Sequence, residues 1–164
     1  MGFARESLLR YEPGSALGGP TWSGRGLVTG KQFISQSEAV TRGVKVVVRA
    51  RYSEEHSDLQ KPIWFFLYTI TISNEGHETV RLLNRHWIIT DANGEIEEVQ
   101  GPGVIGEQPT LEPGESFQYT SGCPLGTPFG SMHGTYDMLV LRTGEHFDAE
   151  IAGFALRKDA AQVN

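Results

Sequence analysis

The most suggestive chemical pattern in this chain is a glycine string of the form G-x-G-x-x-G, made by Gly101, Gly103 and Gly106. In dinucleotide-binding proteins such a string joins a strand to a helix, whose amino terminus supplies amide donors to a pyrophosphate. Here the string is followed by Pro109 and Pro113, which do not permit a regular helix. The sequence therefore favours a tight, irregular loop. Weak contact of phosphate with the backbone amides of the loop is the alternative.

Carboxylates offer a second candidate site. Between His86 and Leu141 the chain has no lysine or arginine, and its acidic residues there include Glu95, Glu97 and Glu107. Mg²⁺ favours hard oxygen ligands, whereas Co²⁺ also accepts imidazole and carboxylate. Glu95 and Glu97 lie on one face of an expected strand. Glu107 lies beyond this strand, so it approaches them only if the tertiary fold brings it there. We expect no resident cofactor, and weak binding of Mg²⁺ or Co²⁺ by these three residues is the alternative.

Nucleophilic catalysis would require a base beside Cys123, the single cysteine. His133 follows ten residues later, and none of the five histidines has the spacing of a known zinc or protease motif. We therefore predict that the protein is not an enzyme and that Cys123 is a small loop residue.

Length and composition restrict the function further. The 164 residues suit one domain, and the net charge of −6 argues against general binding of nucleic acid. One cysteine excludes an internal disulfide framework and agrees with a reducing compartment. No apolar run reaches the roughly 18–20 residues of a membrane span. These observations favour a cytoplasmic protein without a nucleic-acid or membrane partner.

Alternating apolar and polar residues predict strands over most of the chain. Val44, Val46 and Val48 alternate with more polar neighbours, and Asn93-Gly94 is a strong hairpin signal. The expected strands are 44–49, 63–73, 79–90, 95–100, 115–121, 131–141 and 146–156. About seven strands without an amphipathic helix predict an all-β fold, an antiparallel β-sandwich of immunoglobulin or fibronectin type III character. A barrel is the structural alternative.

The chain divides into an arm, a domain and a tail. Residues 1–38 are expected to form a flexible N-terminal arm, because the segment 13–30 has six glycines and two prolines. Residues 39–157 form the predicted sandwich, and residues 158–164 form a C-terminal tail.

Aromatic residues have different predicted roles. The expected strands place four of them in the core: Trp64, Phe66, Tyr68 and Trp87. The hydroxyl of Tyr136 is a candidate to bond the backbone, as in the tyrosine corner of sandwich domains. Four further residues lie near expected loops, where they either pack normally or form an exposed contact patch: Phe117, Tyr119, Phe129 and Met132.

Several long motifs follow one another through the expected domain: FLYTITI at 66–72, LLNRHWIIT at 82–90, EVQGPGVIGEQP at 98–109, LEPGE at 111–115, FQYTSG at 117–122, TPFGSM at 127–132 and GTYDM at 134–138. Together they resemble the ApaG family over about residues 39–156. The resemblance implies a fibronectin type III-like sandwich and a link with cobalt and magnesium efflux or resistance. It also implies an interaction module, as in F-box proteins and a DNA-polymerase-interacting protein, and it brings no established catalytic residues.

We therefore predict a non-enzymatic, ApaG-like domain that binds a protein partner or a small ligand and is associated with divalent cation homeostasis. Contact is expected from the loops 101–113 and 123–132, through these residues: Gly101, Gly103, Val104, Ile105, Gly106, Phe129 and Met132. The alternatives are a weak divalent-metal or phosphate/nucleotide-binding protein and a hydrolase acting on phosphate anhydrides. The sequence does not decide the oligomeric state.

Overall fold

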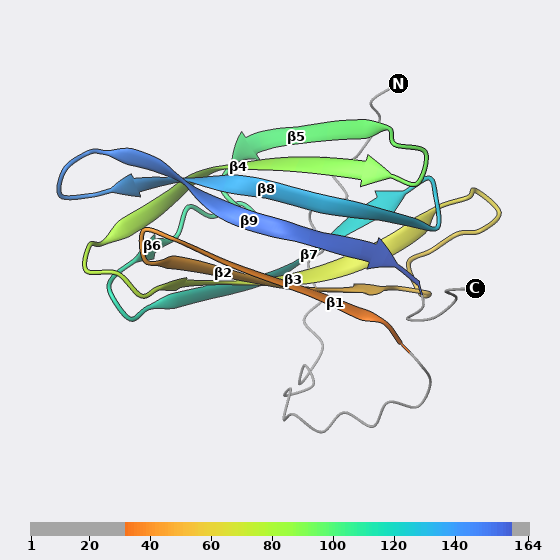
Figure 1. The fold of residues 1–164 in the computed structure, drawn as a ribbon, viewed down its shortest axis with the longest axis horizontal. Helices are drawn as coiled ribbons and strands as arrows, with labels where there is room; N and C mark the ends of the chain where they lie inside the picture. Colours follow the sequence, from red (N-terminus) through yellow and green to blue (C-terminus); the bar gives the residue numbers. More distant parts are fainter. Residues whose placement is uncertain (1–31, 159–164) are drawn as a thin grey trace.

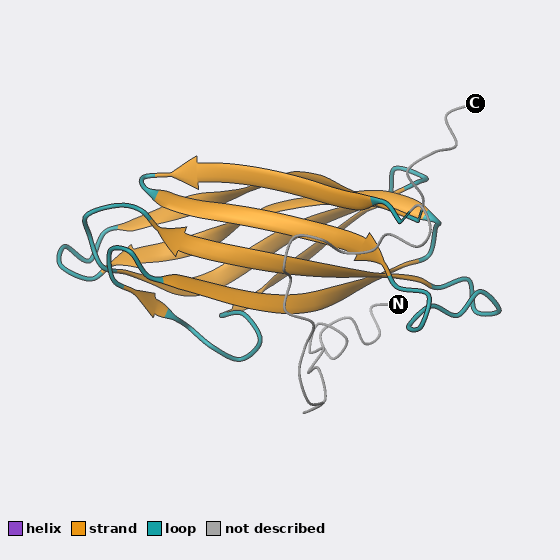
Figure 2. Cartoon of the chain, turned by 90° about the horizontal axis from the view of Figure 1, so that it is seen from below, coloured by secondary structure: helices purple, strands orange, loops and turns teal. Residues whose placement is uncertain are grey.

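Two antiparallel sheets packed face to face form the domain (Figures 1 and 2). The computed structural model describes residues 32–158, and this part of the chain contains no α-helix. Within it, no helix is long and apolar enough to cross a membrane. The first sheet has the strand order β1-β2-β3-β7, and the second has the order β5-β4-β8-β9 with β6 beside β4. The predicted sandwich is confirmed, and two separate sheets contradict the barrel.

The strands have these bounds: β1 Ile34–Thr41, β2 Val44–Tyr52, β3 Trp64–Asn74, β4 Val80–Asp91, β5 Ile96–Pro102, β6 Thr110–Leu111, β7 Ser116–Leu125, β8 Phe129–Val140 and β9 His146–Arg157. Seven of them correspond to the predicted strands. β1 and β6 were not predicted from the sequence.

The expected boundary of the N-terminal arm at residue 38 is too late, because β1 already begins at Ile34 and pairs with β2 along its whole length. Three hydroxyl side chains of β1 also bond the backbone of β9 over 2.8–3.0 Å, in the pairs Ser35 with Ala155, Ser37 with Ala152 and Thr41 with Glu150. These bonds close one side of the sandwich. Residues 1–31 of the arm and residues 159–164 of the tail lie outside the described part of the chain.

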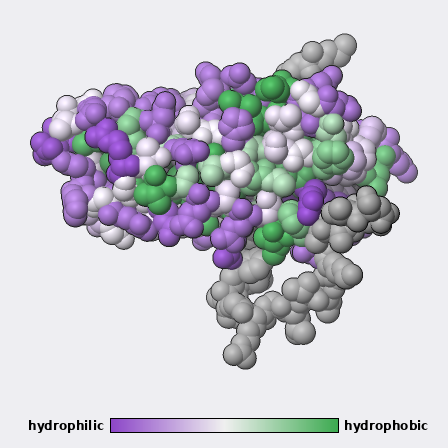
Figure 3. Space-filling view, in the orientation of Figure 1, coloured by the Kyte–Doolittle hydropathy of each residue, from purple (hydrophilic) through white to green (hydrophobic). Residues whose placement is uncertain are grey.

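Alternate side chains of both sheets fill the interior with aromatic and branched residues. Phe66, Tyr68 and Trp87 are fully buried, as predicted, and Trp64 is partly buried against them. The rings of Tyr68 and Trp87 meet edge to face at 5.5 Å and join the two sheets. On the face seen in Figure 3, the apolar side chains that reach the surface form separate groups among hydrophilic ones.

The expected loop 123–132 is mostly strand. β7 continues to Leu125 and β8 begins at Phe129, so Cys123 is a buried strand residue rather than a loop residue. Met132 is fully buried, whereas Phe129 is 54% exposed. Cys123 and Met132 both face the core between the sheets. The glycines and prolines near them in the sequence favour a loop, so their burial in strands was not predicted.

The side of the sandwich opposite β1 and β9 is more open. β9 packs against β1 and β2, while β7 and β5 are the edge strands on the other side. The segment 103–109, which connects β5 to β6, lies at this open side.

Asn74 holds the end of β3 against two neighbouring segments. Its side chain is buried, and Nδ2 donates to the carbonyl oxygens of Glu78 and Leu111 over 2.8 and 2.9 Å. Oδ1 accepts a hydrogen bond from the Gly76 amide over 3.0 Å. Asn74 thereby links the β3–β4 turn to β6.

We expect Asn74→Ala to lower the free energy of unfolding by about 3 kcal/mol, because two carbonyl oxygens lose their donor in a buried environment. Asn93→Ala, at an exposed turn position, is the control and should change stability by less than about 0.5 kcal/mol. Urea denaturation measures both values. Equal losses for the two variants would contradict the structural role of Asn74.

Candidate functional site

The loop after β5 is a tight turn. Val104 and Glu107 exchange two backbone hydrogen bonds of 2.8 and 2.9 Å, so Ile105 and Gly106 are the central residues. Their φ angles of 44° and 80° are both left-handed, as a type I′ turn requires. The chain beyond Gly106 continues without a helix, as was predicted from Pro109 and Pro113.

Each glycine of the string has a structural role in this turn. Gly103 has a φ of 64°, and a Cβ there would lie 2.3 Å from the Glu107 carbonyl oxygen, so no other residue fits. At Gly101 a Cβ would lie 3.0 Å from Nη1 of Arg85, whose guanidinium covers this glycine. The spacing of the glycines therefore follows from the shape of the loop and from its contact with Arg85.

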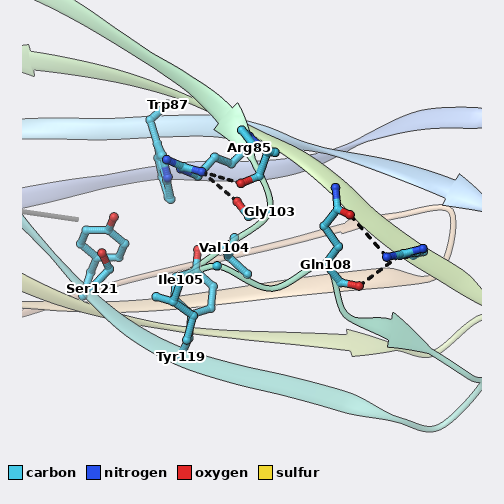
Figure 4. Close-up of a pocket in the computed structure, with 12 residues that line it drawn as sticks. Arg85, Trp87, Gly103, Val104, Ile105, Gln108, Tyr119 and Ser121 are labelled. Carbon is cyan, nitrogen blue, oxygen red and sulfur yellow. Dashed lines mark hydrogen bonds between the residues drawn. The ribbon is translucent and has the colours of Figure 1, made fainter. Parts of the chain in front are cut away.

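Arginine side chains and a backbone carbonyl of β4 hold the loop in place, and Figure 4 shows the bonds of Arg85. Nη1 of Arg85 donates to the Gly103 carbonyl oxygen over 3.0 Å and to the preceding carbonyl over 2.9 Å. The Leu83 carbonyl accepts from the Gly103 amide and from Nε2 of Gln108, over 2.8 and 2.9 Å. Nε of Arg81 donates to the Gln108 carbonyl over 3.2 Å. Leu83 is available to the loop because a bulge at this residue shifts the register between β4 and β8.

A cavity of about 570 Å³ lies between the two sheets beneath this loop. We call it the tyrosine–arginine pocket. The first sheet contributes Tyr68, Tyr119 and Ser121, and the second contributes Arg81, Arg85 and Trp87. Figure 4 shows Tyr119 and Ser121 on one side of this space and Arg85 and Trp87 on the other. Residues 102–106 and Gln108 complete the lining that the described residues form, which contains two arginines and no carboxylate.

Tyrosine hydroxyls form a buried cluster at the inner end of the pocket. The hydroxyls of Tyr119 and Tyr136 hydrogen-bond each other, and the Tyr68 side chain bonds its cross-strand neighbour Ser121. Burial raises the pKa of all three tyrosines well above the usual value, although Arg85 opposes the shift. The phenols therefore stay neutral. In the Tyr119–Tyr136 pair, one hydroxyl hydrogen makes the mutual bond and the other remains for a further acceptor.

The hydroxyl of Tyr136 bonds Tyr119 and not the backbone, so the predicted tyrosine corner is wrong. Tyr119 is itself buried, which also removes it from the expected exposed patch. The physical reason is that both residues point into the same interior from facing sheets, where each phenol needs a polar partner.

Arg85 retains donors for a ligand. Both of its bonds to the loop use Nη1, and within residues 32–158 no acceptor is bonded to Nη2 or Nε. Neither Arg85 nor Arg81 forms an ion pair with a carboxylate in this range. A guanidinium edge with two parallel donors matches a carboxylate or phosphate group. Among the described residues, the lining contains no histidine, cysteine or carboxylate, and its polar side chains are arginine, glutamine, tyrosine and serine.

The structure brings only some of the predicted contact residues together. Gly103, Val104, Ile105 and Gly106 all line the pocket, with Val104 buried and Ile105 43% exposed. Gly101 lies beneath Arg85, on the other side of its guanidinium.

Phe129 and Met132 do not belong to this group. Phe129 pairs with Arg157 at the start of β8, and the side chain of Met132 is enclosed in the core. Neither lines the pocket.

Three residues that give the pocket its chemistry were not predicted from the sequence, namely Arg81, Arg85 and Ser121, and Tyr119 was considered only as part of an exposed patch. One signal was present for Arg85, because it has the same strand parity as the core residues Trp87 and Ile89. An arginine on the apolar face of a strand indicates a polar partner in the interior.

The three glutamates of the predicted metal site are not gathered in one place. Glu95 precedes β5, Glu97 lies within it, and Glu107 follows its far end. A strand of this length spans roughly 20 Å. Among residues 32–158, no group of three histidine, cysteine, aspartate or glutamate residues is arranged to hold a metal ion.

Comparison with known proteins gives one consistent family. Residues 54–140 match the family described as ApaG domain. The chain is 53% identical over 119 residues to Protein ApaG of Methylobacterium radiotolerans, covering 73% of this chain and 91% of that protein. It is 51% identical over 117 residues to Protein ApaG of Beijerinckia indica, covering 71% and 89%. The crystal structure of a Bordetella pertussis protein described as ApaA has a TM-score of 0.70 and 44% identity, covering 75% of this chain and all of that one.

Ile105 provides a test of backbone strain in the loop. A β-branched residue in the left-handed region is strained by about 1–2 kcal/mol, whereas Asn-Gly is the preferred pair for this turn. We expect Ile105→Asn to raise the free energy of unfolding by about 1 kcal/mol. The control is Ile96→Asn, at an exposed position with no left-handed φ, which should give no gain. A loss of stability in the Ile105 variant would contradict the assigned turn.

A second test concerns the glutamates. Because Glu95 and Glu107 lie beyond opposite ends of β5, we expect Mg²⁺ to cause no saturable change shared by the amide signals of Glu95, Glu97 and Glu107. Co²⁺ should likewise broaden no common set of these signals. Nuclear magnetic resonance titration measures both, and a shared, saturable response would instead support the metal site.

Proposed function

This chain belongs to the ApaG family, and on that premise we propose that it is a non-enzymatic binding domain whose ligand site is the tyrosine–arginine pocket. The observation that carries the proposal is the lining itself, in which Arg81 and Arg85 occur with tyrosine and serine hydroxyls and, among residues 32–158, without any carboxylate. A cavity of about 570 Å³ also has the size of common ligand sites. The ligand is an anionic group, carboxylate or phosphate, presented by a partner protein or a small molecule.

Arginine, rather than the glycine loop, supplies the donors for this anion. The amides of Gly103, Val104 and Glu107 are already bonded to the carbonyls of Leu83, Glu107 and Val104, respectively. These three amides are therefore not available to cradle a phosphate. The proposal assigns a bound phosphate to Arg85 rather than to the loop backbone.

We propose that the expected association with cobalt and magnesium homeostasis runs through the bound partner. The described residues contain no cluster of metal-ligating side chains, so this chain is not assigned a metal of its own. A cytoplasmic location fits the single, buried Cys123 and is part of the same proposal.

Titration with pyrophosphate and with succinate tests the pocket, because the two probes carry phosphate and carboxylate. We expect saturable shifts of amide signals at Arg81, Arg85, the 103–108 loop and Tyr119. A probe at 100 times its dissociation constant should stabilise the fold by about 2.7 kcal/mol, which a melting experiment detects. Arg85→Gln should weaken binding at least about tenfold.

Arg49→Gln is the matched control for charge, since Arg49 lies on the exposed face of β2, away from the pocket. It should bind both probes as the parent chain does. The proposal fails if neither probe shifts these signals, or if the Arg85 and Arg49 variants bind equally well.

A further inference from the structure

β7 is an edge strand with an unoccupied side. It pairs with β3 along Ser116–Leu125, and within residues 32–158 no strand pairs with its other side. The Asn74 amide bonds the Glu115 carbonyl over 2.9 Å, which sets the phase of the antiparallel ladder. By the alternation of that ladder, the backbone N–H and C=O of residues 116, 118, 120 and 122 point away from β3.

Within residues 32–158, this edge lacks the usual protection against pairing. Natural edge strands carry lysines, central prolines, bulges or a covering segment. β7 has ten residues without any charge, and Pro124 lies only near its end. Side-chain bonds to β3 hold it in regular register, as between Thr120 and Thr69 over 2.8 Å. By contrast, the hydroxyls of β1 cover the backbone of β9 on the other side of the sandwich.

The free edge of β7 borders the tyrosine–arginine pocket. Tyr119 and Ser121, both on β7, form one wall of that pocket, and Arg85 faces them from the second sheet. A strand added beside β7 would extend the first sheet across the mouth of the pocket. Since successive side chains alternate between the faces of a sheet, every second side chain of the added strand would point inward, toward Arg85.

We propose that β7 accepts an extended segment of a partner protein, whose inward-facing glutamate or aspartate enters the pocket and pairs with Arg85. This inference rests on the proposed function and names its ligand. The partner's backbone bonds the outward groups of β7, which gives affinity, and the acidic side chain in the pocket gives specificity. Charge complementarity selects the acidic side chain, because the lining formed by the described residues holds two arginines and no carboxylate.

The probe is a displayed library of random peptides of roughly nine residues, long enough to pair with most of β7. We expect selection on the parent chain to enrich one glutamate or aspartate, with apolar residues two positions away on either side. Changing that acidic residue to its amide in a selected peptide should weaken binding at least about tenfold. This comparison leaves the protein itself unchanged.

Two substitutions at Thr120 distinguish the loss of backbone pairing from the loss of the side-chain hydroxyl. Thr120→Pro removes an outward N–H, while Thr120→Val loses the same hydroxyl bond but keeps the amide. We expect the proline variant to lose at least about tenfold in peptide affinity relative to the valine variant. Melting curves of the two variants without peptide show whether each is folded.

Three results would overturn the strand-docking proposal: selected peptides without an acidic residue, equal binding by the two Thr120 variants, or a free chain that is a dimer paired through β7. If pyrophosphate or succinate still binds in an Arg85-dependent way, only this inference fails and the pocket proposal stands. If neither probe nor any peptide binds, both fail.

Discussion

The position of the Arg85 guanidinium is the constraint on which the rest of the site depends. Its Nη1 bonds two carbonyls at the start of the loop, and Gly101 leaves the space in which the guanidinium lies. Strand alternation puts Arg85 on the same side of β4 as Trp87, and the bulge at Leu83 changes the phase of the strand just before it. This one side chain therefore both bonds the loop and contributes charge to the pocket, and it lies close enough to the buried phenols to oppose the rise in their pKa.

The sandwich was readable from the sequence because most strands alternate clearly, as at Val44 to Val48, and end at turns such as Asn93-Gly94. β1 was not predicted, because its polar sequence does not alternate clearly. It forms a strand by pairing with β2 and by hydrogen-bonding the backbone of β9. Val104 and Ile105 were predicted as contact residues because they lie within the local glycine string. The approach of Arg85 to Tyr119 was not predicted, because these two residues come together from different sheets.

At the mouth of the pocket, a strained backbone and a partly exposed apolar side chain occur at the same residue. Ile105 keeps a left-handed backbone that asparagine would adopt more easily, and its side chain remains partly exposed. The same side of the domain has the uncharged edge of β7, whereas the opposite side is closed by hydroxyl bonds from β1. The features that do not serve stability are thus gathered around one pocket, as in sites that bind a ligand.

The most direct measurement of the central claim is the side-chain nitrogen resonance of Arg85 during a titration with pyrophosphate. If Arg85 binds the anion, its Nε–H signal shifts saturably, while the corresponding signal of Arg49 stays in place. An unchanged Arg85 signal, with saturable shifts elsewhere on the domain, would show that the anion binds outside the tyrosine–arginine pocket.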